Sequence, residues 1–324
     1  MDPVVAGLLE SPEPSIGLKT LLEVVGAPED SPEVLAAREQ VRSSERVGRL
    51  LSRRGADGRI PINPYQKWCG AHWTLAMLAE LGYPPGDESL APLREQVYEW
   101  ILSEAHLASV HVINGRARRC GSQEGYAAWA LIMLGLDDDR TVALVNNLLG
   151  WQWPDGGWNC DRRPEADTSS FHETWLPMRA LSLVARRYGC TACAEGARRA
   201  AEVFLKRRLF RRASDGEVID QRFLRLAWPP YWRYSILAGL GSLAEAGLAA
   251  DERCAEALDV LESRRLPDGG WQADERLYKV LDPGGKLYMQ MSPVDWGPIG
   301  RRRMNEWVTV EALAVLRAAG RFRC

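Results

Sequence analysis

The chain has 324 residues, and 46% of them are hydrophobic, which is enough to bury a large core. Its formal net charge of −2 excludes a general attraction to nucleic acid or to an anionic membrane surface. Apolar runs are all shorter than the roughly 18 residues of a transmembrane helix, and the start, Met1 to Ser15, lacks the pattern of a secretion signal. The seven dispersed cysteines then predict reduced thiols in a cytoplasmic protein.

Five copies of one unit follow a first helical stretch at residues 16–40. Each unit has an amphipathic helix, a turn that contains Asp-Gly or Asn-Gly, and a more apolar helix rich in Ala and Leu. In chain order, the predicted helix pairs are 32–54 with 66–81, 88–107 with 122–136, 139–151 with 170–188, 192–210 with 231–246, and 251–265 with 304–319. The turn dipeptides begin at Asp57, Asn114, Asp155, Asp215 and Asp268.

This alternation predicts an all-α fold with the apolar helices inside and the amphipathic helices outside. A helix that is apolar on nearly all sides needs neighbours all round, and a closed ring supplies them. We therefore expect one α/α toroid of five to six hairpins over residues 31–324, preceded by an N-terminal helical extension over residues 1–30. The long connection at residues 274–303 predicts a lid or an ordered excursion.

Two of the turns belong to near copies of one motif. Residues 152–158 read Gln-Trp-Pro-Asp-Gly-Gly-Trp, and residues 265–271 repeat the pattern with Arg265 in place of Gln. The motif is similar to the Gln-x-x-Asp-Gly-Gly-Trp repeat of squalene cyclases, and the chain resembles the terpenoid cyclase and protein prenyltransferase superfamily over roughly residues 57–319. The resemblance implies the toroid fold, as a single barrel, and a packing role for Trp158 and Trp271.

The resemblance also implies an isoprenoid-handling enzyme that acts on an apolar substrate in an aromatic-lined central cavity. The Asp-x-Asp-Asp and Asp-Asp-x-x-Asp motifs of the cyclases are missing. His172 lies where the zinc-binding His of prenyltransferase beta subunits would lie, but Cys120 to Gly125 replace the Asp-x-Cys pair of that family. Two alternatives stay open: a non-catalytic toroid that binds lipid or peptide, and a metal-dependent enzyme on another substrate. Whether the protein works together with a partner chain also stays open.

In a closed ring the starts of the inner helices meet at one end, where their positive dipole ends attract anions. Aromatic residues gather at these starts and are candidates for substrate binding by cation–π attraction, with core packing as the alternative. The candidates are Trp68, Trp73, Tyr126, Phe171, Trp175, Tyr231, Trp232, Tyr234 and Trp307.

The same helix starts carry candidates for acid–base catalysis, because a carboxylate beside Trp in a dry cavity has a raised pKa and can donate a proton. These candidates are His172, Glu173, Asp161, Glu124 and Glu306. The alternative is that they form salt bridges with nearby arginines. His106 and His111, at the end of an outer helix, are expected to have surface or capping roles.

Cysteine and histidine at these starts also suggest a zinc site. Cys69 and His72 are three residues apart and would share one face of a helix. With Cys120 and His172, and with Cys160 or Asp161 as a further ligand, they form a set of sulfur, nitrogen and oxygen donors. The alternative is that the cysteines are small buried hydrophobes. Cys190 and Cys193 stand apart in an interhelix loop, where no redox role is expected.

Overall fold

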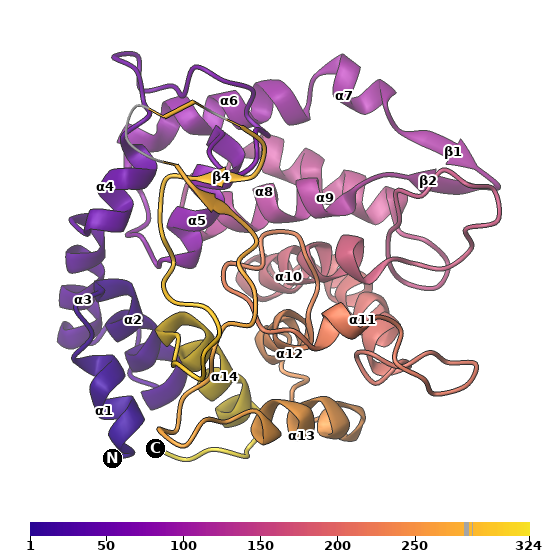
Figure 1. The fold of residues 1–324 in the computed structure, drawn as a ribbon. Helices are drawn as coiled ribbons and strands as arrows, with labels where there is room; N and C mark the ends of the chain where they lie inside the picture. The colour runs from indigo at the N-terminus through magenta and orange to yellow at the C-terminus, as the bar shows by residue number, and fades with distance from the viewer. Residues whose placement is uncertain (282–284, 287) are drawn as a thin grey trace.

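The computed structural model describes residues 1–281, 285–286 and 288–324 (Figure 1). These residues form fourteen α-helices and two short two-stranded sheets, so the all-α prediction is confirmed. The five apolar helices, called the inner helices below, are α5 (Ala71–Glu80), α8 (Gly121–Met133), α10 (Phe171–Tyr188), α12 (Ile236–Glu245) and α14 (Glu306–Ala318).

The amphipathic helices precede them in the chain, and three of the five are divided into shorter pieces. They are α3 (Pro32–Arg42) with α4 (Glu45–Leu51), η2 (Glu88–Leu90) with α6 (Ala91–Ile101) and α7 (Glu104–Ala108), α9 (Asp139–Trp151), α11 (Thr191–Leu205), and η4 (Glu252–Cys254) with α13 (Ala255–Ser263). Serine N-caps start two of the later pieces, α4 and α7: the side chain of Ser44 accepts from Val47 N–H, and that of Ser103 from His106 N–H. These caps explain the divisions before α4 and α7.

Two inner helices begin about five residues later than the sequence predicts. The helix expected from residue 66 starts at Ala71, because the backbone at Gly70 lies against Asn63 and Pro64, where a Cβ would be 2.3 Å from Pro64 O. The helix expected from residue 231 starts at Ile236, since Tyr231 has a φ of 52° outside the helical region.

One turn dipeptide forms a β-hairpin in place of a helix connection. Strands β1 (His111–Ile113) and β2 (Arg116–Arg118) pair antiparallel around Asn114 and Gly115, whose φ angles are 51° and 71°. Two positive φ values in a two-residue loop are the mark of a type I′ turn, for which Asn-Gly is the favoured sequence. The hairpin connects α7 to α8 along the chain and projects at the right-hand edge of the molecule in Figure 1.

The inner helices pack side by side in chain order. Helix α5 contacts α8, α8 contacts α10, α10 contacts α12, and α12 contacts α14. Helix α14 then contacts α2 (Pro14–Lys19) and the π-helix η1 (Thr20–Val25), which follow α1 (Pro3–Leu9). Val5, Ile16 and Leu18 belong to the main core cluster, so the N-terminal helices are built into the body of the protein.

The two motif copies have the same structural role. The indole Nε1 of Trp158 donates to Leu148 O in α9, and that of Trp271 donates to Leu261 O in α13. Gln152 donates to the carbonyl of Gly156, and Arg265 makes the matching bond to the carbonyl of Gly269. Both tryptophans are at most 1% exposed, as packing residues are.

The long connection before α14 is described in part. Trp68 N–H donates to Met291 O, and Trp68 Nε1 donates to Leu277 O, both at 2.9 Å. Short parallel strands β3 (Lys279–Val280) and β4 (Met291–Ser292) lie in this connection, and the 3-10 helix η3 (Gln221–Leu224) precedes α12. The expected lid also includes residues 282–284 and 287, which lie outside the described residues.

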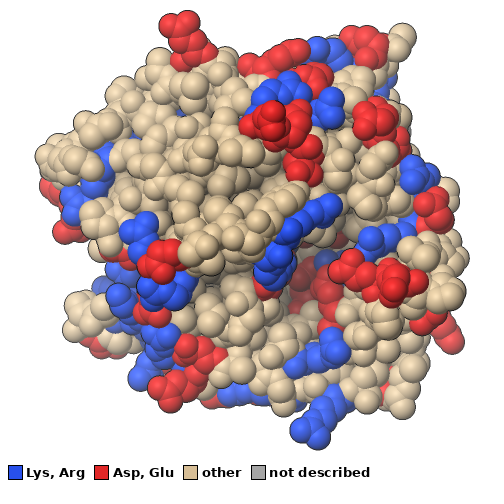
Figure 2. Space-filling view, turned by 180° about the vertical axis from the view of Figure 1, so that it is seen from behind, with Lys and Arg blue, Asp and Glu red and all other residues tan. Residues whose placement is uncertain are grey.

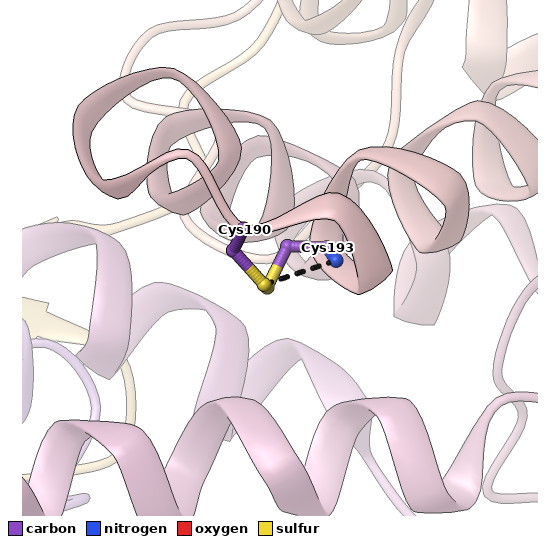
Figure 3. The surroundings of a disulfide bond; sticks show 2 residues. All are labelled: Cys190 and Cys193. Carbon is purple, nitrogen blue, oxygen red and sulfur yellow. Dashed lines mark hydrogen bonds between the residues drawn. A yellow bond between two sulfur atoms is a disulfide. The ribbon is translucent and has the colours of Figure 1, made fainter.

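Cys190 and Cys193 form a disulfide at the start of α11 (Figure 3). Cys190 is the N-cap, its sulfur accepts from Cys193 N–H at 3.2 Å, and the Cα atoms are 5.2 Å apart, within the range a disulfide requires. The expectation of reduced thiols throughout is therefore wrong for this pair. In the part of the chain that is described, no helix has the length and hydropathy to cross a membrane.

Candidate functional site

Cys120, Cys160 and Glu173 come together at the starts of α8 and α10. One ligand atom from each lies within 4.8 Å of the other two. Cys120 is the N-cap of α8, Glu173 lies in the first turn of α10, and Cys160 lies in the loop after Trp158. Among the described residues, these are the Cys, His, Asp or Glu side chains that gather in a group of three. We call them the thiol–carboxylate triad.

Backbone pairing brings the loop of Cys160 to the two helix starts. Arg119 N–H donates to Asn159 O at 3.1 Å, which places Cys160 beside Cys120. Ser170 N–H donates to Trp158 O at 2.9 Å, which holds the start of α10 on the same loop. The triad therefore depends on contacts between two neighbouring units of the repeat.

Glu173 is 6% exposed and is held from both sides. Ser122 donates to its Oε2 from the backbone N–H at 3.2 Å and from Oγ at 2.7 Å, while the Cys160 thiol lies 3.6 Å from Oε1. Burial raises the pKa of Glu173 above its usual value. The hydrogen bond to Cys160, then burial, and then the nearby Glu173 raise the pKa of Cys120.

The donor chemistry of the triad fits zinc. Two sulfur donors and one carboxylate are ligand types that zinc accepts, and three protein ligands leave a fourth position open, as in catalytic zinc sites. The ligand set differs from the one expected from the sequence: Cys120 and Cys160 are shared, Glu173 completes the set, and Cys69, His72 and His172 lie outside it.

Cys69 and His72 do not pair because α5 begins only at Ala71, so Cys69 is not on the helix. The His72 ring is enclosed by Tyr65, Trp73 and other aromatic rings, and neither ring nitrogen has a hydrogen-bond partner. Burial lowers the pKa of His72 to about 3, so its ring is neutral at pH 7.

His172 lies in a separate small cavity of about 130 Å³. Its Nδ1 accepts from the backbone N–H of Tyr234 at 2.8 Å. Burial, helped by Arg222 and Arg233, lowers the pKa of His172 to about 4. A neutral ring that accepts at Nδ1 carries its proton on Nε2, so His172 is a hydrogen-bond donor.

The walls of this small cavity are mostly basic and aromatic. Arg222, Arg225 and Arg233 line it together with Trp232, whose ring is 5.4 Å from that of His172. The Nζ of Lys67 lies 4.8 Å from the Trp232 ring. Burial lowers the pKa of Lys67, and Cys120 opposes this shift.

The other acid candidates have structural roles. Asp161 accepts from Arg163 through the backbone N–H and the guanidinium, which lowers the pKa of Asp161 to about 2 and fixes the loop. Glu306 accepts from Ser11 Oγ at 3.2 Å and so ties α14 to the N-terminal segment. The structure places neither residue in the triad.

Glu124 is fully buried beside His106 and Arg119. The Nε2 of His106 is 2.9 Å from Glu124 Oε1, and Arg119 Nε donates to the same oxygen at 3.1 Å. His106 is thus 9% exposed and bound to a carboxylate, and the expected surface role is wrong for it. Glu124 Oε2 has no partner in the described structure.

Most of the aromatic candidates pack against one another. The Trp68 ring stacks on Tyr231 at 3.9 Å and meets Trp73 edge-on at 4.6 Å. Other candidate rings also pack against aromatic rings. Tyr126 lies beside Trp73 and Trp175, Phe171 packs edge-on against Tyr234, and Trp307 stacks on Trp228 at 4.1 Å. The alternative of core packing therefore describes them, except that Trp175, Trp232 and Tyr234 also line cavities.

A larger cavity, about 830 Å³ in volume, lies where the inner helices end. Its lining includes Glu80, Met133 and Arg187, from the last turns of α5, α8 and α10. Acidic and basic side chains gather in a hollow on the face shown in Figure 2. These residues therefore do not form the expected aromatic-lined cavity. We call the space that they line the charged cavity.

The sequence carries one signal for the charged cavity. Glu80, Arg179, Glu245 and Glu311 are charged residues within otherwise apolar inner helices. A charge at such a position must be paired or must face a cavity, because burying it alone is costly.

No family model matches the chain, and no curated protein matches it. Among solved structures, the chain is similar to the crystal structure of a protein from Actinoplanes. The two share 19% sequence identity and a TM-score of 0.45, over 98% of this chain and 88% of the other. These comparisons therefore assign no function to the chain.

Proposed function

We propose that this protein is a metal-dependent enzyme in which Cys120, Cys160 and Glu173 hold a zinc ion. The observation that carries the proposal is the convergence of two thiols and one carboxylate within 4.8 Å at the starts of α8 and α10. Three groups that become anions together repel one another unless a cation lies between them. A divalent metal supplies that cation, and zinc prefers this mixture of sulfur and oxygen donors.

The surroundings of the triad support a metal site. Ser122 holds one carboxylate oxygen of Glu173 with two hydrogen bonds, which leaves Oε1 directed toward Cys160. Such outer hydrogen bonds orient the ligands of a metal. The helix starts add the positive ends of two helix dipoles, which favour the thiolate and carboxylate forms.

A zinc ion with three protein ligands supplies Lewis-acid chemistry to whatever occupies its open position. The small cavity lined by His172, Trp232 and Arg233 would hold another part of the substrate, since His172 precedes Glu173 in the first turn of α10. There His172 presents an Nε2–H donor, Trp232 offers a flat wall, and Arg233 adds positive charge. These groups suit a substrate with an anionic or carbonyl oxygen.

We also propose that the inner helices close into the expected toroid. The chain of contacts from α5 to α14 continues to α2, and the end of α5 lies close to α2, since a Cβ at Gly82 would be 2.7 Å from Leu18 Cδ2. The resemblance to the terpenoid cyclase and prenyltransferase superfamily supports the same arrangement. An isoprenoid substrate is favoured less, because both cavities carry charged side chains.

The test is the zinc content of the purified protein, measured by elemental analysis. We expect about one zinc per chain in the wild type, and its loss in Cys120→Ser and Cys160→Ser. Cys254→Ser changes a buried free cysteine outside the triad and is the matched control; it should keep its zinc. Cys69→Ala and His172→Ala should keep it as well, because neither residue is in the triad.

Zinc that stays bound in the Cys120→Ser/Cys160→Ser double variant would contradict the proposed ligands. Protein that binds no zinc even after incubation with the metal would overturn the proposal altogether. Circular dichroism of each variant checks that the helices are intact.

A further inference from the structure

The proposed function leaves the disulfide between Cys190 and Cys193 unused. The bond joins residues whose sequence separation is 3, and both lie at the start of α11 (Figure 3). A disulfide stabilises a fold most when it closes a long loop, whereas this one closes a very short loop on a single helix. The bond therefore connects no two distant parts of the fold.

The two sulfurs differ in their access to solvent. Cys190 is partly exposed and lies in a surface stretch, since residues 186–189 before it and residues 191–192 after it are all exposed. Cys193 is 0% exposed and belongs to the main core cluster. A thiol from solution can therefore approach Cys190, whereas the sulfur of Cys193 is buried behind it.

The start of α11 suits Cys190 as a thiolate. Cys190 is the N-cap of this helix of 15 residues, and its sulfur accepts from the backbone N–H of Cys193 at 3.2 Å. The positive end of the helix dipole acts at the same place, so the helix stabilises a negative charge on this sulfur in the reduced protein. A stabilised thiolate is also a good leaving group in disulfide exchange.

The charges around this helix start are mainly positive. Residues 186–187, in the last turn of α10, are two arginines that donate to backbone carbonyls and pair with no carboxylate among the described residues. Glu195 of α11 is paired with Arg198 at 2.8 Å. Asp137 accepts from the Tyr188 hydroxyl at 2.6 Å. The balance of these groups adds to the preference for an anionic sulfur.

We propose that Cys190 and Cys193 form a site for thiol–disulfide exchange with a dithiol partner. In the oxidised protein, a partner thiolate attacks Cys190 Sγ, and the bond between the two protein sulfurs breaks with Cys193 leaving as a thiolate. The second thiolate of the partner then attacks the partner's own sulfur in this mixed disulfide, and Cys190 leaves as a thiolate. Two electrons and two protons pass from the dithiol to the protein, and the partner departs as a disulfide. The reverse reaction begins with attack by the Cys190 thiolate.

The expectation that this pair has no redox role was based on the missing βαβ unit around it. Exchange needs an accessible sulfur at a helix start and a second sulfur within reach, and α11 supplies both without a βαβ unit. The proposal does not depend on the zinc ion, since neither cysteine belongs to the thiol–carboxylate triad.

Trapping with oxidised glutathione tests the order of attack. In reduced Cys193→Ser, glutathione should stay on Cys190, because the sulfur that would release it is missing. Peptide mass spectrometry measures each cysteine separately, and Cys324, an exposed free cysteine, gives the rate of an ordinary thiol in the same sample. We expect Cys190 to react about threefold faster or more. Equal trapping on Cys193 in Cys190→Ser, or slower reaction of Cys190 than of Cys324, would overturn the proposal.

Reduction of insulin by dithiothreitol, followed by turbidity, tests turnover, with dithiothreitol as the dithiol and insulin as the disulfide. The wild type should accelerate the reaction, and the Cys190→Ser/Cys193→Ser double variant should lose this acceleration. Cys254→Ser and Cys324→Ser, outside the pair, are the matched controls and should keep it. Circular dichroism checks that each variant is folded. No acceleration by the wild type, or equal acceleration by the double variant, would sink the proposal, while zinc analysis of the same samples reports on the metal site separately.

Discussion

Ser122 donates two hydrogen bonds to a single oxygen of Glu173, one from its backbone N–H and one from its hydroxyl. The pair joins the start of α8 to the first turn of α10 and sets the direction of the other carboxylate oxygen. Substituting Ser122→Ala removes the hydroxyl bond while it keeps all three triad residues. We expect zinc affinity to fall by about 10- to 100-fold, as is usual when the partner of a metal ligand is lost.

Competition with a chromophoric chelator measures that affinity. Ser182→Ala is the control, because Ser182 is a buried serine of α10 whose hydroxyl has no partner. An equal loss of affinity in both variants would point to general destabilisation of α10 and not to the orientation of Glu173.

The close approach of α8 and α10 depends on Gly125. A Cβ at this position would lie 2.6 Å from Pro177 N and 2.8 Å from Leu176 C, and backbone atoms cannot move aside easily. We expect Gly125→Ala to lower the free energy of unfolding by about 1–3 kcal/mol, the usual effect of overpacking.

Urea denaturation compares this variant with Gly150→Ala in α9, where a Cβ would meet nothing within 4 Å. The control should gain about 0.5–1 kcal/mol, because alanine suits a helix better than glycine does. Gly125→Ala that matched its control in stability would show that the two helices can separate without loss.

Arg179 pairs with two carboxylates, that of Glu80, which is 10% exposed, and that of Glu245, which is 34% exposed. Substituting Arg179→Met leaves Glu80 and Glu245 without their partner, and we expect the free energy of unfolding to fall by about 3–5 kcal/mol, as for other broken buried ion pairs. Arg198→Met removes an exposed pair with Glu195 on α11 and should cost at most about 1 kcal/mol.

The added change Glu80→Gln in the Arg179→Met background should recover part of this stability, because it removes one of the isolated charges. A double variant less stable than Arg179→Met alone would argue that Glu80 is stabilised by groups other than Arg179. Chemical denaturation at pH 7 gives both values.

The sequence by itself determined the helical array. Helix periodicity and Asp-Gly turns are local signals, so helix α9 was predicted with its observed bounds, and Trp158 and Trp271 have the packing role that was expected of them. The Asn114-Gly115 dipeptide was also a local signal, but one for a β-hairpin, and it was assigned to the wrong kind of turn.

Only the tertiary structure decided which side chains meet. Cys120, Cys160 and Glu173 were all candidates, but they come together through the pairing of Arg119 with Asn159, which no local pattern specifies. Cys69 and His72 do not share a helix face as expected, because Gly70 lies against Pro64 and α5 begins only after it. The charged cavity brings Lys19 from the first helices to Glu311 from the last, and such long-range contacts follow from packing, which spacing along the chain does not encode.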